Sequence, residues 1–134
     1  MQFIENGHDI SFEEFSKKFP SESKIFATHL AEDWRIKISE KSIYLLHGEF
    51  KPISINIDGI LENHKINLYH KSLYKEVLAK AIGLKKGKSK PKLLDATGGL
   101  LGDTLLIRSF AVDEIHILER HPLAAALIVN AISN

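Results

Sequence analysis

The sequence predicts an α/β protein, in which the start of an open parallel sheet follows a small α+β amino-terminal region. Between residues 92 and 132 the pattern runs strand, glycine-rich loop, helix, strand, helix, which is how open α/β sheets begin. Between residues 34 and 60, apolar and polar residues alternate as in antiparallel strands. With 134 residues, of which 44% are hydrophobic, the chain suits one compact domain or a small domain plus part of another.

The first predicted helix covers residues 11–19. Phe12, Phe15 and Phe19 recur at helical spacing and form an apolar face. Ser11 and Glu14 have the spacing of a capping box, which sets the start of the helix. Pro20 predicts its end.

Three short strands are predicted next, at residues 34–38, 42–47 and 53–57. The first two are separated by a short polar turn and form a hairpin. Asp58-Gly59 is a typical turn sequence and would close the third strand. Residues 34–60 therefore predict a small antiparallel meander, with Trp34 in its core.

A second helix is predicted at residues 72–84, with Ser72 as its N-cap. The sequence KKGKSKPK that follows has the composition of a linker. We place a domain boundary there, near residue 88, which separates an amino-terminal region, 1–88, from a carboxy-terminal one, 89–134.

The carboxy-terminal region predicts two strand–helix units. Strands are expected at 92–95 and 114–119 and helices at 102–110 and 122–132, with Pro122 in the first turn of the last helix. The two strands should be parallel and joined by a right-handed crossover.

The net charge of +1 conceals an uneven distribution. Residues 1–63 carry −4, residues 64–92 carry +8 and residues 93–134 carry −3. The middle segment is either a surface for a polyanion or a solvated helix face followed by a lysine-rich loop. Within it, Tyr69, His70 and Tyr74 either stack on nucleic-acid bases or pack beside the helix start.

Composition also excludes several classes of site. The chain has no cysteine, which rules out thiol catalysis, thiolate metal sites and disulfides. The seven histidines show no His-x-x-x-His pair with a supporting acid, so no metal site is expected. There is no apolar run of the roughly 20 residues that a membrane span needs, and no secretory signal pattern at the start. We therefore expect a cytoplasmic protein without membrane contact.

The sequence LLDATGGLLGD, residues 93–103, is the main candidate for a binding site. Aspartate replaces the lysine of a phosphate-binding P-loop, and only half of the G-x-G-x-x-G dinucleotide pattern is present. Asp95 would also repel a pyrophosphate, whereas acids suit the positively charged methionine end of S-adenosylmethionine (SAM). Glu119, which ends the next strand, suits ribose hydroxyls. The pattern favours SAM, and a glycine-rich turn without a ligand stays the alternative.

Three segments together resemble a known family. LAKAIGLKKG at 78–87, LLDATGGLLGD at 93–103 and ILERHPLAAALI at 117–128 resemble the RsmJ-type methyltransferases, which use SAM to modify guanine N2 of small-subunit 16S ribosomal RNA. The resemblance runs from about residue 53 to the end. It implies a Rossmann-like methyltransferase sheet, SAM as the cofactor, and ribosomal RNA or the small ribosomal subunit as the partner.

The resemblance also implies roles for individual residues. Asp95 and Gly99 would form the cofactor loop, and Gly102 and Asp103 would stand where the family has an Arg-Asp pair that contacts SAM. Glu119 would bind the ribose, with Arg120 beside it.

The loop departs from the family pattern Asp-Ala-Thr-Ala-Gly-Leu-Gly-Arg-Asp at three positions. Gly98 replaces an alanine, and Leu101-Gly102 replaces Gly-Arg. These exchanges predict either weaker cofactor binding or a loop that is shifted by one residue.

Length is the other departure, because family members have about 250 residues. The family's catalytic Asp-Pro loop would lie beyond Asn134, so no catalytic residue is named. The resemblance therefore predicts a shortened member of the family, either active or inactive alone, whose open sheet edge a second copy or a partner chain would cover. The alternative is a non-enzymatic RNA-binding or assembly module derived from such an enzyme.

Overall fold

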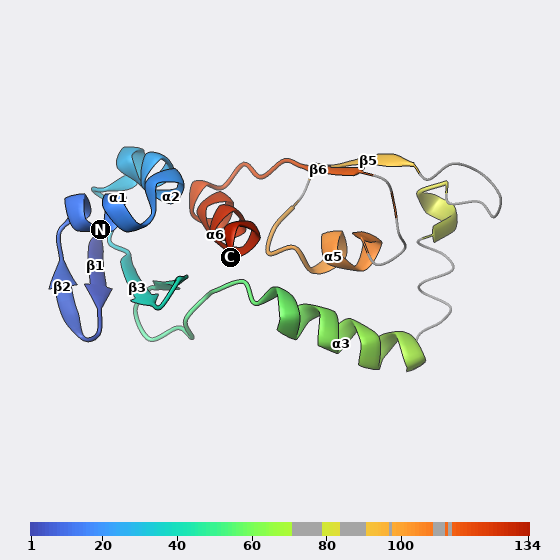
Figure 1. Ribbon diagram of the computed structural model, residues 1–134, viewed down its shortest axis with the longest axis horizontal. Coiled ribbons are helices and arrows are strands. Elements are labelled where there is room, and N and C mark those ends of the chain that lie inside the picture. Colours follow the sequence, from blue (N-terminus) through green and yellow to red (C-terminus); the bar gives the residue numbers. More distant parts are fainter. Residues whose placement is uncertain (71–78, 84–90, 97, 109–111, 113) are drawn as a thin grey trace. The chain divides into compact units, whose positions relative to one another are not determined.

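The computed structural model describes residues 1–70, 79–83, 91–96, 98–108, 112 and 114–134 (Figure 1). Its contacts group the chain into two compact units. The first unit comprises Met1–Ile55 and Arg120–Asn134, and the second unit comprises Asn56–Glu119. Each unit is described by itself below.

The first unit contains a four-stranded sheet in the order β2-β1-β3-β4. Its strands are β1 (Gln2–Glu5), β2 (His8–Ile10), β3 (Arg35–Ser39) and β4 (Ser42–Leu46). β1 and β3 are parallel, and the other two pairs are antiparallel. The predicted hairpin is confirmed as β3–β4, whereas β1 and β2 were not expected from the sequence.

Helices α1 (Phe12–Lys18), α2 (Pro20–Phe26) and α6 (Pro122–Ser133) belong to the same unit, with a short 3₁₀ turn at Ala27–His29. The predicted capping box is confirmed, because Ser11 and Glu14 exchange side-chain and backbone hydrogen bonds. The hydrogen bond from the Ser11 backbone N–H lowers the pKa of Glu14. Pro20 does follow the end of α1, but it also opens α2 as its first residue.

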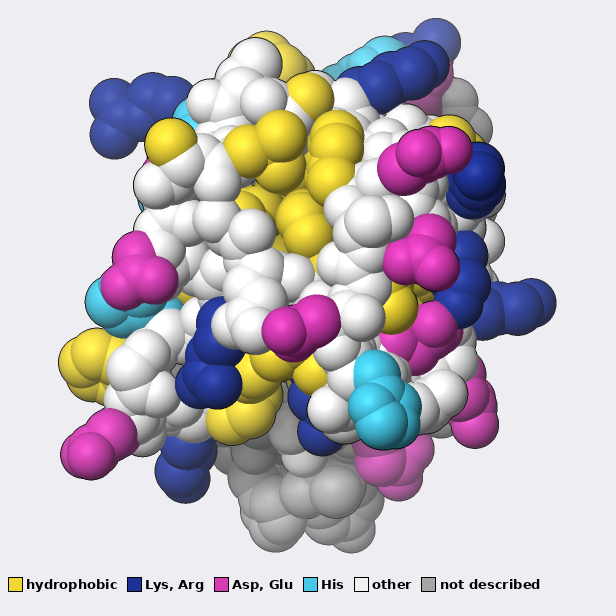
Figure 2. Space-filling model, turned by 90° about the vertical axis from the view of Figure 1, so that its left-hand side faces the viewer, with side chains coloured by type: hydrophobic (Ala, Val, Ile, Leu, Met, Phe, Trp, Pro, Cys, Tyr) yellow, Lys and Arg dark blue, Asp and Glu magenta, His cyan; other side chains and the backbone are white. Residues whose placement is uncertain are grey.

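Aromatic rings form the centre of the first unit. The Phe15 ring lies 4.5 Å from that of Phe3 and 5.1 Å from that of Phe19. The buried side chains of this core come from β1, β3, β4, α1, α2, α6 and the residue between α1 and α2: Phe3, Phe15, Phe19, Phe26, Ile36, Ile38, Ile43, Leu45, Leu123, Ala126 and Leu127. The face of this unit in Figure 2 shows hydrophobic side chains bordered by charged ones of both signs.

The predicted third strand at residues 53–57 is wrong. Only one isolated bridge forms, between Leu45 and Ile53, with N···O distances of 2.8 and 3.0 Å. The next N–H on the same edge of β4, that of Ile43, is bonded to Asn130 of α6 instead. Residues 54–56 therefore have no further β4 N–H to pair with, and the chain turns into a helix.

The predicted turn at Asp58-Gly59 is also wrong, because both residues lie in α3 (Ile57–His70). Asn56 caps this helix, and its side-chain oxygen accepts the Gly59 N–H at 3.0 Å. Asp58 lies in the first turn, where a negative charge is favoured by the helix dipole.

The second unit also contains β5 (Lys92–Asp95), α5 (Gly102–Arg108) and β6 (Glu114–Ile117). β5 and β6 are parallel, as predicted, and Asp95 pairs with Ile117. Most of the predicted helix 72–84 and the predicted boundary near residue 88 lie outside the described residues. The division into 1–88 and 89–134 stays a prediction, although the contacts place α6 with the first unit.

No helix among the described residues has the length and apolar character needed to cross a bilayer.

Asn130 connects α6 to the edge of β4 through a buried group of hydrogen bonds. Its side-chain oxygen accepts the Ile43 N–H at 3.1 Å, and its amide donates to the Lys41 carbonyl at 2.9 Å and to Glu22 at 3.2 Å. Glu22 and Asn130 are both at least 95% buried. Each of these hydrogen bonds therefore replaces one that the buried polar group would otherwise make to water.

We expect Asn130→Ala to destabilise the first unit by about 2–4 kcal/mol, because the variant leaves the Ile43 N–H and the Glu22 carboxylate without this partner. Urea unfolding followed by circular dichroism measures the loss. Asn134→Ala is the matched control, since its amide donates to the same Lys41 carbonyl from an exposed position and its removal should cost less than about 0.5 kcal/mol. Equal effects of the two substitutions would contradict this role of Asn130.

Candidate functional site

The candidate site lies where β5 ends and the glycine-rich loop begins. The Asp95 carbonyl accepts the Leu118 N–H at 2.8 Å, and the Leu118 carbonyl accepts the Gly98 N–H at 3.2 Å. These two bonds continue the pairing of β5 and β6 past the last residues of both strands. The loop therefore leaves the carboxyl ends of two parallel strands, which is where open α/β sheets bind their ligands.

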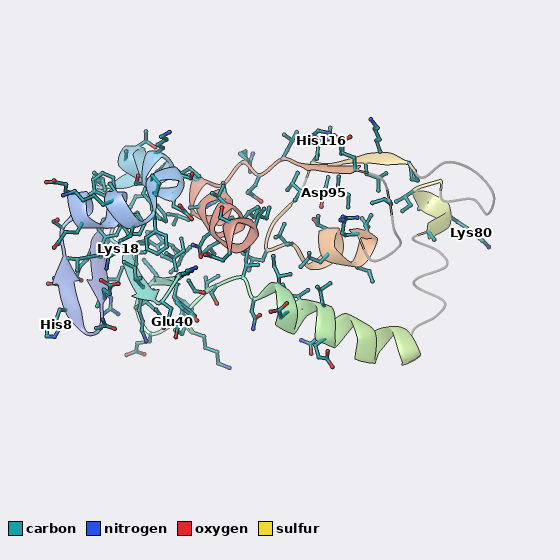
Figure 3. All side chains as sticks on the ribbon, in the orientation of Figure 1. His8, Lys18, Glu40, Lys80, Asp95 and His116 are labelled. Carbon is teal, nitrogen blue, oxygen red and sulfur yellow. The ribbon has the colours of Figure 1, made fainter. Side chains whose placement is uncertain are left out.

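Asp95 faces the helix that follows the loop. Its carboxylate accepts a hydrogen bond from the Thr104 hydroxyl, and Thr104 is only 4% exposed. Figure 3 shows Asp95 between the β5–β6 pair and α5. The hydrogen bond fixes this carboxylate relative to the first turns of α5.

Glu119 reaches the glycine loop from the end of β6. Its carboxylate accepts the Gly99 N–H at 2.7 Å, in a half-buried position. Gly99 has a φ of +52°, a conformation that glycine adopts without strain. This contact is consistent with the acids expected from the sequence at the ends of both strands, since both lie next to the same loop.

Leu101 has the most unusual backbone of the loop, with a φ of +68°. Such values are rare for a bulky residue, because the Cβ approaches the following carbonyl oxygen. Its side chain is 1% exposed, so it is buried and does not lie on the loop surface. Its N–H donates to the Gly98 carbonyl at 2.9 Å, which closes a tight turn.

Gly102 and Asp103 open α5 and are both exposed. A Cβ added at Gly102 would meet no heavy atom within 4 Å, so a side chain fits there. Asp103 lies in the first turn, where the helix dipole favours its charge.

The structure brings five of the six predicted site residues into one loop and its surroundings: Asp95, Gly99, Gly102, Asp103 and Glu119. Arg120 belongs to the first unit, so its position relative to the others is not described. Sequence reasoning missed Thr104 as the partner of Asp95. A hydroxyl nine positions after a strand-ending acid, in the first turn of the next helix, is the pattern that points to it.

The fold and the site together define a class of protein. Two parallel strands, a glycine loop between the first strand and its helix, and acids at both strand ends are typical of proteins that bind an adenosine-containing cofactor. Carboxylates around the loop favour a cofactor with positive charge over one with phosphates.

Comparison with known proteins identifies the family within this class. The family described as SAM-dependent methyltransferase matches residues 23–134. The chain therefore belongs to the SAM-dependent methyltransferases, as the resemblance of its three motifs implied.

Individual relatives carry a more specific name. The chain is 32% identical over 81 residues to the ribosomal RNA small subunit methyltransferase J of Alkalilimnicola ehrlichii, an alignment that covers 60% of this chain and 29% of that protein. It is 38% identical over 82 residues to the protein of the same name from Buchnera aphidicola subsp. Schizaphis graminum, covering 61% and 31%. The chain thus aligns with about a third of the length of these relatives.

A solved structure supports the fold. The SAM-dependent methyltransferase NGO1261 from Neisseria gonorrhoeae matches with a TM-score of 0.52 and 18% identity, over 77% of this chain and 40% of that chain. At this identity the match supports only the fold, and the fold agrees with the predicted α/β class.

We expect Leu101→Gly to be more stable than Leu101→Ala by about 1 kcal/mol, which reverses the usual order of these two residues next to a helix. Both variants lose the same buried side chain, so the comparison isolates the positive φ at this position. Urea unfolding of the two variants measures the difference. An alanine variant as stable as the glycine variant would contradict the strained conformation.

We expect Thr104→Val to destabilise the second unit by about 1–2 kcal/mol, because the valine keeps the shape of threonine but removes the hydrogen bond to Asp95. Thr104→Ser keeps the hydroxyl and should restore most of that loss. Thermal unfolding of the three proteins measures the effect. If valine and serine behave alike, the hydroxyl does not support Asp95.

Proposed function

We propose that the second unit binds SAM at the glycine loop and that the chain acts in methylation of guanine N2 in small-subunit ribosomal RNA. The observation that carries the cofactor proposal is the hydrogen bond between the Gly99 N–H and the Glu119 carboxylate. It fixes an acid from the end of the second strand beside the loop that leaves the first strand. A carboxylate in that position accepts hydrogen bonds from ribose hydroxyls.

The loop residues fit this cofactor. Asp95, Asp103 and Glu119 supply negative charge for an ammonium and a sulfonium group. The side chain of Leu101 is buried, so the exchange of glycine for leucine places no side chain on the loop surface at this position. Gly102 offers space at the helix start but no positive charge, which supports weaker binding than with the family's arginine.

The chemistry that SAM supplies when bound is an electrophilic methyl group on its sulfonium. The described residues of this chain would bind and orient the cofactor. Glu119 would bind the ribose, Asp95 would face the positively charged end, and the backbone around Gly99 would lie close to the cofactor. Orientation of this kind is the main contribution of protein to an in-line methyl transfer. No residue of the chain is proposed as the acceptor for the amine proton.

The substrate is proposed from the relatives, whose name assigns them to small-subunit ribosomal RNA. The lysine-rich residues 64–92 lie largely outside the described residues, and their contact with RNA stays a prediction. Lys80, which is described, is exposed (Figure 3). We also propose a cytoplasmic location, since ribosomal RNA is modified there and the chain carries no cysteine.

A non-enzymatic RNA-binding module remains the second candidate, because the chain aligns with about a third of the length of its curated relatives. A methylation assay on small-subunit RNA with labelled SAM separates the two. Incorporation of the label supports an enzyme, and cofactor binding without incorporation supports a module that retains the cofactor site.

We expect Glu119→Ala to weaken the binding of SAM and S-adenosylhomocysteine by about tenfold or more, because the variant loses the charged hydrogen-bond acceptor beside the loop. Isothermal titration calorimetry measures both affinities. Glu114→Ala is the matched control, since this acid lies at the opposite end of β6 and pairs with Lys92. Absence of heat from the unmodified chain at millimolar ligand would overturn the cofactor proposal.

A further inference from the structure

Three aromatic side chains form a group at one end of the β3–β4 hairpin in the first unit. The His47 ring lies 4.6 Å from the Trp34 ring and 6.4 Å from the Phe50 ring, nearly parallel to the latter at 17°. A turn closed by the Phe50 N–H and the His47 carbonyl, with Gly48 at a φ of +55°, brings Phe50 back over His47. Trp34, predicted as a core residue, is half-buried and packs against the core from this edge.

Phe50 is exposed to an extent that the fold does not require. Its side chain is 77% accessible, the highest value among the large hydrophobic residues described. A single exposed aromatic ring is common, but this ring lies nearly parallel to that of His47. Such an arrangement offers an open aromatic face to a flat partner.

The adjoining face of the sheet carries two basic side chains on β3 and one acidic side chain, Asp9 of β2, which lies in register with Lys37 across Ile4 of β1. Arg35 and Lys37 of β3 are exposed on the side opposite to the buried Ile36 and Ile38, and Tyr44 of β4 lies directly across from Lys37. Neither Arg35 nor Lys37 makes an ion pair with any residue that the structure describes. Their charge is therefore available to an external anion.

A hollow of about 340 Å³ lies between these two features. Asp33, Trp34, Arg35 and Leu46 are among the residues that line it. The hollow combines an aromatic wall, a guanidinium group and a carboxylate. These are groups that stack on a base, hold a phosphate and accept a hydrogen bond from a base amino group, respectively.

We propose that this face of the first unit binds an unpaired segment of RNA. Bases would stack on Phe50 and against Trp34, and the sugar-phosphate backbone would follow Arg35 and Lys37. The choice of RNA rests on the proposed function, whereas the stacking and charge arguments do not. Unpaired nucleic acid is favoured over a duplex, because only splayed bases expose a face to aromatic side chains.

Acidic residues near the group limit where a phosphate can lie. Asp33 and Glu49 are both exposed next to the aromatic residues. They would repel a backbone that ran past the turn at residues 47–50. The phosphates are therefore expected over β3 and the bases at the turn.

The single tryptophan of the chain reports directly on this face. We expect an unpaired RNA of about 12 nucleotides to quench Trp34 fluorescence in a saturable way, without added SAM. A duplex of the same sequence should bind at least about tenfold more weakly. Failure of cofactor binding leaves this result unchanged, so the two proposals fail separately.

Variants test stacking and charge independently. Phe50→Ala should weaken RNA binding about tenfold, and the combined Arg35→Gln and Lys37→Gln variant should weaken it and reduce its dependence on salt concentration. Lys24→Gln is the matched control, since this cation is exposed on α2, whose Phe26 packs in the core with Ile36 on the side of the sheet opposite to Arg35 and Lys37. Circular dichroism confirms that each variant is folded.

Two outcomes would overturn the proposal. Equal quenching by duplex and unpaired RNA would show that bases are not stacked. An unchanged affinity of the folded Phe50→Ala variant, with loss only in the charge variant, would reduce the face to a general polyanion contact.

Discussion

The candidate site of the second unit depends on how the backbone N–H groups of the glycine loop are bonded. The loop leaves a strand, so its N–H groups have no partners within a helix or sheet of their own. Leu118 and Glu119 supply the acceptors, through a carbonyl for Gly98 and a carboxylate for Gly99. The end of β6 therefore shapes the loop that follows β5. A change at either strand end alters the position of the acids and of the glycines together.

The departure of this loop from its family pattern has a local physical meaning. The family's glycine corresponds to Leu101, whose φ of +68° is one that glycine adopts easily. Gly102, one residue later, has no positive φ and has room for a side chain. The chain thus carries its glycine one position after the place that needs it. Burial of the Leu101 side chain offsets the cost of the strained backbone.

Local signals were sufficient for part of the fold. The capping box of Ser11 and Glu14, the β3–β4 hairpin and the start of α6 at Pro122 each depend on a few neighbouring residues, and each is confirmed. The dipeptide Asp58-Gly59 suits both a turn and the first turn of a capped helix, so the sequence alone does not distinguish these two structures. The approach of Glu119 to Gly99 could be expected from strand order, whereas the bond from Thr104 and the φ of Leu101 depend on how α5 packs.

The edge of β4 explains why the predicted meander stops after two strands. An exposed edge presents unpaired N–H and C=O groups, and here two different segments satisfy them. Leu45 pairs with Ile53, and Ile43 pairs with the side chain of Asn130 near the end of the chain. Because α6 also contributes Leu123, Ala126 and Leu127 to the core of the first unit, that core contains residues from both ends of the sequence. The amino-terminal sheet and the helix after β6 therefore form one folded unit, even though the glycine loop and its two strands lie between them in the chain.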